Sequence, residues 1–232
     1  MIDAHLLSYQ NVTISNLLTW HPYQVQTLHL KPGRYTLTAV GATPIPFTVD
    51  QTGIVDVDPA VAGVSGRGTH TLTLSGLPLT VDATATAYQN VTFSSATPAH
   101  PNTRYTVRLL PGRYTFYGPG ATGIPVTLLP DGTIDHDPGL GYVSGRGTGT
   151  LTVSGLPLTV DATRLGPFAL NPATGWLDAH QPQHLRLLPG TYTFVVANVR
   201  SFRFTVTPGG TFDYAPDLTN VSGQGTATLT AW

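Results

Sequence analysis

The residues with the clearest chemical potential in this chain recur in one short string. Val64–Thr69 reads VSGRGT, Val143–Thr148 repeats it, and Val221–Thr226 carries it as VSGQGT. Two glycines around an arginine allow backbone angles that other residues avoid, and they could bring amide groups close to an anion. The alternative interpretation is an arginine that braces its own loop by pairing with an aspartate.

Comparison of the three copies favours the brace. The third copy has Gln224 in place of the arginine and Ala215 in place of an aspartate. Opposite charges that disappear together indicate an ion pair, because losing one side alone would leave a charge without its partner. Asp213 survives in the third copy without an arginine, which argues against its equivalents as the partners. We therefore predict two structural ion pairs, Asp58 with Arg67 and Asp137 with Arg146.

The acidic residues near this string allow two further chemistries, and the pattern disfavours both. Asp135 and Asp137 fall on one face of an expected strand. Calcium takes about six to eight oxygen ligands from a compact loop, so a solvated strand face is the preferred interpretation. A pair of carboxylates could hydrolyse a glycoside. However, this pair is incomplete in the third copy, which argues against a catalytic role.

No motif of an enzyme or a metal protein is present. The chain has eight histidines without metal-ligand spacing, and it has no cysteine. It contains no nucleophile elbow, phosphate-binding loop or dinucleotide-binding glycine string. We therefore expect no catalytic residue, no metal site and no cofactor.

The copies differ most in the stretch before a repeated Pro-Gly pair: Leu17–Val25, Ala96–Arg104 and Pro172–Gln183. Aromatic side chains in such loops can stack on sugars, and loops on a regular scaffold often carry recognition. The preferred alternative is that the two tryptophans fold back as plugs over the core. The candidate ligand-binding residues are Trp20, His21, Tyr23, His100, Asn102, Trp176 and His180.

These residues are carried by an internal repeat whose copies lie 79 and 78 residues apart. Self-similarity at a fixed period predicts one supersecondary unit used three times. The expected domains are residues 1–74, 81–153 and 160–232. The joints between them, residues 75–80 and 154–159, both read SGLPLT.

Composition and turn signals predict an all-β fold. The chain is rich in threonine, glycine and proline, with a single lysine, Lys31, and no glutamate. In the second copy, Ile124–Leu129 has the pattern of a strand, and Pro130–Gly132 turns it into a second strand over Thr133–Asp137. A hairpin about Ser154-Gly155 would make neighbouring repeats share a sheet.

Such sharing favours a pseudo-threefold closed assembly, ring-like or propeller-like, in which Ile2–His5 pairs with Thr228–Trp232. The alternatives are a linear row of small β-sandwiches and a stack of β-hairpins. The string LxPGxYT at Leu109–Thr115 resembles a turn of prealbumin-like and bacterial immunoglobulin-like domains. That resemblance implies the linear row and no activity.

Charge and hydropathy exclude some classes of partner. Eleven basic and twelve acidic residues leave a net charge of −1 without a basic stripe, which argues against nucleic-acid binding. No apolar run is long enough to cross a membrane, and the chain opens without a signal-peptide pattern. The composition is typical of exported bacterial proteins and leans toward an extracellular location, but without an export signal in this chain the sequence leaves the location open.

The leading functional hypothesis is a non-catalytic repeat protein that acts as a scaffold or interaction module for a glycan or protein partner. The second is a lectin-like, carbohydrate-binding protein with sites in the variable loops. The third, which the absent motifs disfavour, is a hydrolase.

Overall fold

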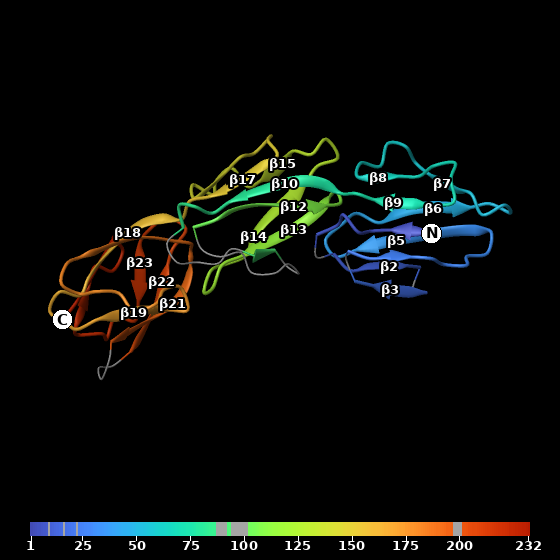
Figure 1. Cartoon of the computed structure of the whole chain (residues 1–232). Helices are drawn as coiled ribbons and strands as arrows, with labels where there is room; N and C mark the ends of the chain where they lie inside the picture. The colour runs from blue at the N-terminus through green and yellow to red at the C-terminus, as the bar shows by residue number, and fades with distance from the viewer. Residues whose placement is uncertain (9, 16, 22, 87–91, 94–101, 197–200) are drawn as a thin grey trace.

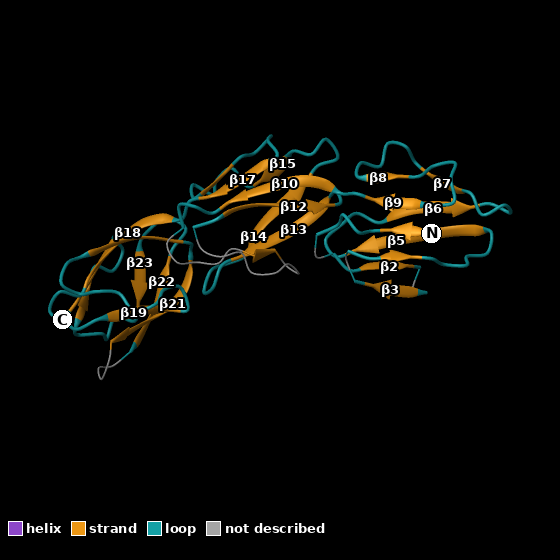
Figure 2. Cartoon of the chain, in the orientation of Figure 1, coloured by secondary structure: helices purple, strands orange, loops and turns teal. Residues whose placement is uncertain are grey.

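The structure is a computed structural model that describes residues 1–232 except 9, 16, 22, 87–91, 94–101 and 197–200. The described residues form strands and turns with no helix, which confirms the all-β prediction (Figure 2). Three groups of strands follow one another in a row (Figure 1). We call them unit one (β1–β9), unit two (β10–β17) and unit three (β18–β25).

Unit two contains two four-stranded sheets, in the orders β12-β10-β17-β16 and β11-β13-β14-β15. The predicted strand–turn–strand around Pro130–Gly132 is confirmed, because β14 pairs antiparallel with β15. The strands are β10 (Leu77–Asp82), β11 (Thr92–Phe93), β12 (Arg104–Leu109), β13 (Gly112–Tyr117), β14 (Ile124–Leu128), β15 (Ile134–His136), β16 (Val143–Ser144) and β17 (Thr150–Val153).

Alternating side chains explain why these strands stack as two layers. Along β14, Ile124, Val126 and Leu128 are buried, whereas the intervening Pro125 and Thr127 are not. A strand places successive side chains on opposite faces, so each sheet has one apolar face. The apolar faces of both sheets meet in a single core, which makes unit two a β-sandwich.

Unit one repeats this arrangement with sheets β4-β1-β9-β8 and β3-β2-β5-β6-β7. Its additional strand, β3, extends the edge of the second sheet next to β2. The strands are β1 (Ile2–Asp3), β2 (Val12–Ile14), β3 (Leu18–Trp20), β4 (Val25–Gln26), β5 (Gly33–Ala39), β6 (Ile45–Val49), β7 (Val55–Val57), β8 (Val64–Ser65) and β9 (Leu72–Leu74).

Unit three has the sheets β20-β18-β25-β24 and β19-β21-β22-β23. Its core is the most aromatic of the three, with stacked pairs such as Phe168 on Phe194. The strands are β18 (Leu156–Asp161), β19 (Phe168–Asn171), β20 (Gln183–Leu187), β21 (Gly190–Val196), β22 (Phe202–Val206), β23 (Phe212–Tyr214), β24 (Val221–Ser222) and β25 (Thr228–Ala231).

The predicted hairpin about Ser154-Gly155 is wrong. β17 pairs with β10 on one side and with β16 on the other, so neither of its edges is free for β18. β18 pairs instead with β20 and β25 of unit three. Strands β10 and β18 begin at Leu77 and Leu156, so the last four residues of each SGLPLT string lie in a strand of the following unit.

The predicted pairing between the two ends of the chain is also not made. β1 pairs parallel with β9 and antiparallel with β4, all within unit one, and β25 pairs with β18 and β24 in unit three. Each terminal strand therefore finds its partners inside its own sandwich. The termini lie in units at opposite ends of the row (Figure 1), and the described residues form no closed barrel or propeller.

Candidate functional site: the joints and the variable loops

The repeated Pro-Gly pair lies where two units meet. In unit two, β12 ends at Leu109 and β13 begins at Gly112, and these strands belong to different sheets. Leu110-Pro111 therefore crosses from one sheet to the other and does not close a hairpin. We call the segment Leu109–Gly112, with its equivalents Leu187–Gly190 in unit three and Leu30–Gly33 in unit one, the Pro-Gly corner.

The Pro-Gly corners of units two and three each insert a leucine into the core of the preceding unit. Leu110 of unit two is fully buried in the core of unit one, and Leu188 of unit three is fully buried in the core of unit two. Burial of one leucine side chain stabilises a structure by about 1.5–3 kcal/mol. The units are therefore joined by apolar packing as well as by the covalent chain.

At the first joint, the side-chain amide of Gln10 in unit one forms hydrogen bonds with residues of unit two. Its Oε1 accepts a hydrogen bond from the backbone N–H of Leu110 at 3.1 Å. Its Nε2 donates to the hydroxyl of Tyr114 at 2.9 Å and to the carbonyl of Val40 at 2.9 Å. The Tyr114 hydroxyl in turn donates to the carbonyl of Leu110 at 2.5 Å. Gln10 is itself buried, so this network is satisfied without water.

Backbone hydrogen bonds tie the same joint. The N–H of Arg113 donates to the carbonyl of Gly41 at 2.8 Å, and the N–H of Thr43 donates to the carbonyl of Pro111 at 2.9 Å. Gly112 lies between them, and a Cβ atom there would come within 2.1 Å of the Gly41 carbonyl oxygen. Glycine is therefore required by the close approach of the two backbones.

The second joint repeats this geometry. The N–H of Thr191 donates to the carbonyl of Gly120 at 2.8 Å, and the N–H of Thr122 donates to that of Pro189 at 2.8 Å. A Cβ atom on Gly190 would come within 2.0 Å of the Gly120 carbonyl oxygen. The hydroxyl of Tyr192 donates to the carbonyl of Leu188 at 2.7 Å, as Tyr114 does at the first joint.

An arginine clamps the link between units at both joints. The Nε of Arg108 donates to the carbonyl of Ser75 at 2.7 Å, and one terminal nitrogen donates to that of Gly76 at 3.1 Å. Arg186 makes the same two contacts with Ser154 and Gly155, at 2.7 and 3.3 Å. The planar guanidinium presents parallel donors, which suits two successive carbonyls.

The joint residues were missed by the sequence-based prediction, although a signal was present. The Pro-Gly corners read Leu-Leu-Pro-Gly in units two and three, but unit one has Lys31 at the second position. In the structure that position is buried where another unit precedes it and exposed in unit one. An apolar residue that becomes charged in one copy marks a surface that is covered only in the others.

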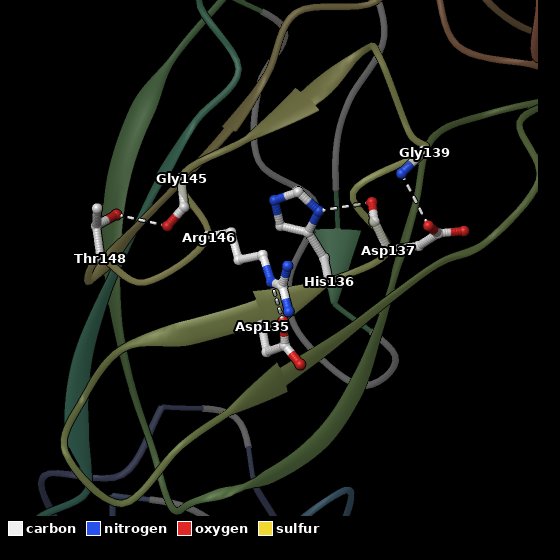
Figure 3. Close-up of polar contacts among 7 residues, drawn as sticks. All are labelled: Asp135, His136, Asp137, Gly139, Gly145, Arg146 and Thr148. Carbon is white, nitrogen blue, oxygen red and sulfur yellow. Dashed lines mark hydrogen bonds and ion pairs between the residues drawn. The ribbon is translucent and has the colours of Figure 1, made fainter.

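The arginines of the repeated string form ion pairs with a different aspartate from the one predicted. Arg67 contacts Asp56 at 2.8 Å, and Arg146 contacts Asp135 at 2.5 Å (Figure 3). The predicted pairs with Asp58 and Asp137 are wrong. Asp213 persists without an arginine because the Nε2 of Gln224 donates to its carboxylate at 3.1 Å, so a neutral donor replaces the arginine.

Asp58 and Asp137 instead cap the turns that follow them. The Asp58 carboxylate accepts from the N–H of Ala60 at 2.9 Å, and that of Asp137 accepts from the N–H of Gly139 at 2.8 Å (Figure 3). Both arginine pairs are about half exposed, and an exposed pair of this kind contributes at most about 1 kcal/mol. The repeated string is therefore a loop brace.

The variable loop of unit three exposes its tryptophan. The loop is held by backbone hydrogen bonds between Phe168 and Leu177. Leu177 and Ala179 are buried, whereas Trp176, Asp178 and His180 alternate with them and are exposed. Trp176 is 61% exposed, so the preferred expectation of a core plug is wrong for this residue. Its indole lies in the same exposed strip as a carboxylate and an imidazole.

The other candidate ligand residues do not gather into one site with this strip. His21 and Tyr23 are exposed in unit one, where the Nδ1 of His21 lies 3.2 Å from the Asn11 side-chain oxygen. Asn102 is exposed in unit two with a positive φ of 57°. The side chain of Trp20 and all of His100 lie outside the described residues.

Several titratable groups have pKa values shifted by local hydrogen bonds or by burial. The hydroxyl of Thr84 donates to the Asp82 carboxylate at 2.6 Å, and this hydrogen bond lowers the pKa of Asp82. Thr163 lowers the pKa of Asp161 in the same way. Burial raises the pKa of Tyr114 well above its ordinary value. The pKa of Asp3 is also lowered, first by the hydrogen bond between its carboxylate and the ring of His5.

A shallow groove lies on the outer face of the second sheet in unit one and recurs in unit two. In unit one it encloses about 620 Å³ between Arg34, Pro46 and the Asp56–Arg67 pair. Two of its charged groups, Asp56 and Arg67, already contact each other. Within the described ranges, no cluster of histidine, aspartate or glutamate could hold a metal ion, and no helix could span a membrane.

Comparisons with known proteins give little beyond this geometry. No protein-family model matches the chain, and no curated protein matches it. Among solved structures, the chain is similar to the pilus adhesin SpaC from Lactobacillus rhamnosus GG, at 15% identity and a TM-score of 0.26. That match covers 82% of this chain and 35% of the adhesin, so the chain spans about a third of that protein. The function must be argued from the joints and loops of this chain.

Proposed function

We propose that the chain is a non-catalytic spacer and interaction module: three sandwich domains, corresponding to the three repeats, held in a fixed row that presents loops at set distances. The observation that carries this proposal is the burial of Leu110 and Leu188 in the cores of the preceding units. A flexible array would need only a covalent linker. Here each joint combines apolar packing, backbone hydrogen bonds and an arginine clamp.

Small-angle X-ray scattering tests this function. The chain supplies its own disruptive substitution, since Lys31 occupies the equivalent position in unit one. We expect the wild-type chain to scatter as an extended particle of constant shape. The variant Leu110→Lys with Leu188→Lys should scatter as a flexible string of domains, because units one and two have Ala60 and Gly139 where unit three has Asp217, so the lysine charge would be buried without a carboxylate partner. Identical scattering from the two proteins would contradict the spacer proposal.

A second candidate function is carbohydrate binding at the variable loop of unit three. The specific observation in its favour is the exposed strip of Trp176, Asp178 and His180, because sugars stack on flat rings and donate hydrogen bonds to carboxylates. A glycan array probes this candidate. The variant Trp176→Ala should lose any glycan binding while keeping its melting temperature. The control variant Tyr117→Ala, which removes an exposed aromatic side chain of unit two, should keep glycan binding. Equal binding by both variants would exclude this loop.

A further inference from the structure

The end of unit three that faces away from unit two carries an uncovered hollow of about 150 Å³, which we call the unit-three socket. Its apolar lining comes from the ends of several strands and from the segment before β24. Besides Phe194 and Trp232, six apolar residues line the socket: Leu165, Val196, Phe202, Leu218, Val221 and Ala231.

The unit-three socket occupies the place that receives a leucine in unit one. In the repeat, its residues correspond to Leu7, Ala39, Ile45, Val61, Val64 and Leu74. All six of these belong to, or pack against, the core cluster that contains Leu110. The socket is therefore formed at the same positions of the repeat as the surface that receives a leucine at the internal joints.

Unit one carries the surface complementary to the socket, its own Pro-Gly corner, and this surface is uncovered. Its Pro-Gly corner keeps Pro32, Gly33 and Tyr35, and the Tyr35 hydroxyl donates to the carbonyl of Lys31 at 2.6 Å, as at the other corners. A Cβ atom on Gly33 would find its nearest neighbour at 3.9 Å. The glycine that permits close approach of another backbone is thus retained where no other unit approaches.

One difference between the two free surfaces and the internal joints is a pair of opposite charges. The Pro-Gly corner of unit one has Lys31, the single lysine of the chain, where the others have Leu110 and Leu188. The socket of unit three is lined by Asp217, where units one and two have Ala60 and Gly139. A lysine can bury its aliphatic stem against apolar residues while its ammonium group reaches a carboxylate at the rim.

We propose that copies of this chain associate head to tail, with the Lys31 corner of one copy seated in the unit-three socket of the next. Lys31 would pair with Asp217 across the contact. Such a contact joins two different surfaces, so it generates an open chain of copies rather than a closed pair. This inference rests on the proposed spacer function, which the association would extend beyond a single molecule.

Sedimentation velocity of the full chain tests the proposal. We expect the wild type to form larger species as protein concentration rises, and high salt to reverse this. Lys31→Glu alone and Asp217→Lys alone should each weaken association at least about tenfold, because like charges then meet across the contact. Arg104→Glu, an exposed charge reversal in unit two, is the matched control and should associate like the wild type.

The decisive measurement mixes the two charge-reversed variants. In the mixture, the corner of the Lys31→Glu variant meets the socket of the Asp217→Lys variant with opposite charges. The reverse contact joins the unchanged Lys31 of one variant to the unchanged Asp217 of the other, so association should return. A wild type that stays monomeric at low salt, or a mixture that stays as weakly associated as its components, would overturn the proposal. If scattering still shows a fixed row in that case, the spacer function stands and only the association between copies is refuted.

Discussion

At the scale of single residues, Gln10 shows how a joint becomes specific. A buried amide that satisfies a backbone N–H, a carbonyl and a hydroxyl fixes the position of the partner unit as well as its presence. Apolar packing alone would tolerate small rotations between units. Gln10 does not, because each displaced hydrogen bond would leave a buried polar group without a partner.

We predict that Gln10→Ala lowers the free energy of unfolding of the chain by about 1–3 kcal/mol, since the buried N–H of Leu110 loses its acceptor. Denaturant unfolding followed by intrinsic fluorescence measures this change. Gln51→Ala, in an exposed turn of unit one, is the matched control and should leave the unfolding curve in place. An equal effect of both substitutions would show that Gln10 has no special role.

The aspartate–threonine caps predict how stability depends on pH. Hydrogen bonds from Thr84 and Thr163 lower the pKa of Asp82 and Asp161 from the ordinary value of 3.8. A carboxylate with a lowered pKa in the folded state stabilises the fold above its unfolded pKa. This contribution is lost as pH falls below 3.8 through the lowered value.

We therefore expect the double variant Thr84→Val with Thr163→Val to lose less stability than the wild type between neutral and strongly acidic pH. Thermal unfolding across this range measures the difference. Thr106→Val removes an exposed threonine contact on β12 without touching a carboxylate, so it should retain the wild-type pH dependence. Parallel pH curves for wild type and double variant would contradict the role of the caps.

At the scale of elements, the strands were predictable and their partners were not. Alternation and the Pro130–Gly132 turn correctly indicated β14 and β15. The Ser154-Gly155 and Pro111-Gly112 segments have equally good turn residues, but each joins strands of different sheets. Turn residues specify a change of direction, whereas the choice of partner depends on which sheet edges remain free.

The candidate sites show the same division. Sequence comparison found the repeated arginine string and its role as a brace, but it chose the wrong aspartate because glutamine can replace arginine as a donor to Asp213. It expected Trp176 to act as a plug, although the loop is anchored by Leu177 beside it. In both cases the deciding contact is one that the residue types alone leave open.

Gly112 provides the test at this scale. We predict that Gly112→Ala destabilises the chain by about 1–3 kcal/mol, because the new Cβ would overlap the Gly41 carbonyl oxygen and force the first joint apart. Gly33→Ala makes the same chemical change at the equivalent corner of unit one, where space is free, and should cost less than about 0.5 kcal/mol. Thermal unfolding of both variants gives the comparison, and equal losses would refute the close approach.

At the scale of the whole molecule, the two joints turn three small sandwiches into one body. The leucine, the glycine and the arginine recur at both joints, so the same relation between neighbours is built twice. The three units follow one another in a row (Figure 1). The proposed spacer function requires this repeated packing to be rigid.

Residual dipolar couplings of the backbone amides in a weakly aligned sample test that fixed geometry most directly. If the joints are rigid, one alignment tensor should fit the couplings of all three units in the wild-type chain. The variant Leu110→Lys with Leu188→Lys should need a separate tensor, of different magnitude, for each unit. Separate tensors of different magnitude in the wild type would contradict the account, because they would show that the units reorient independently despite their shared cores.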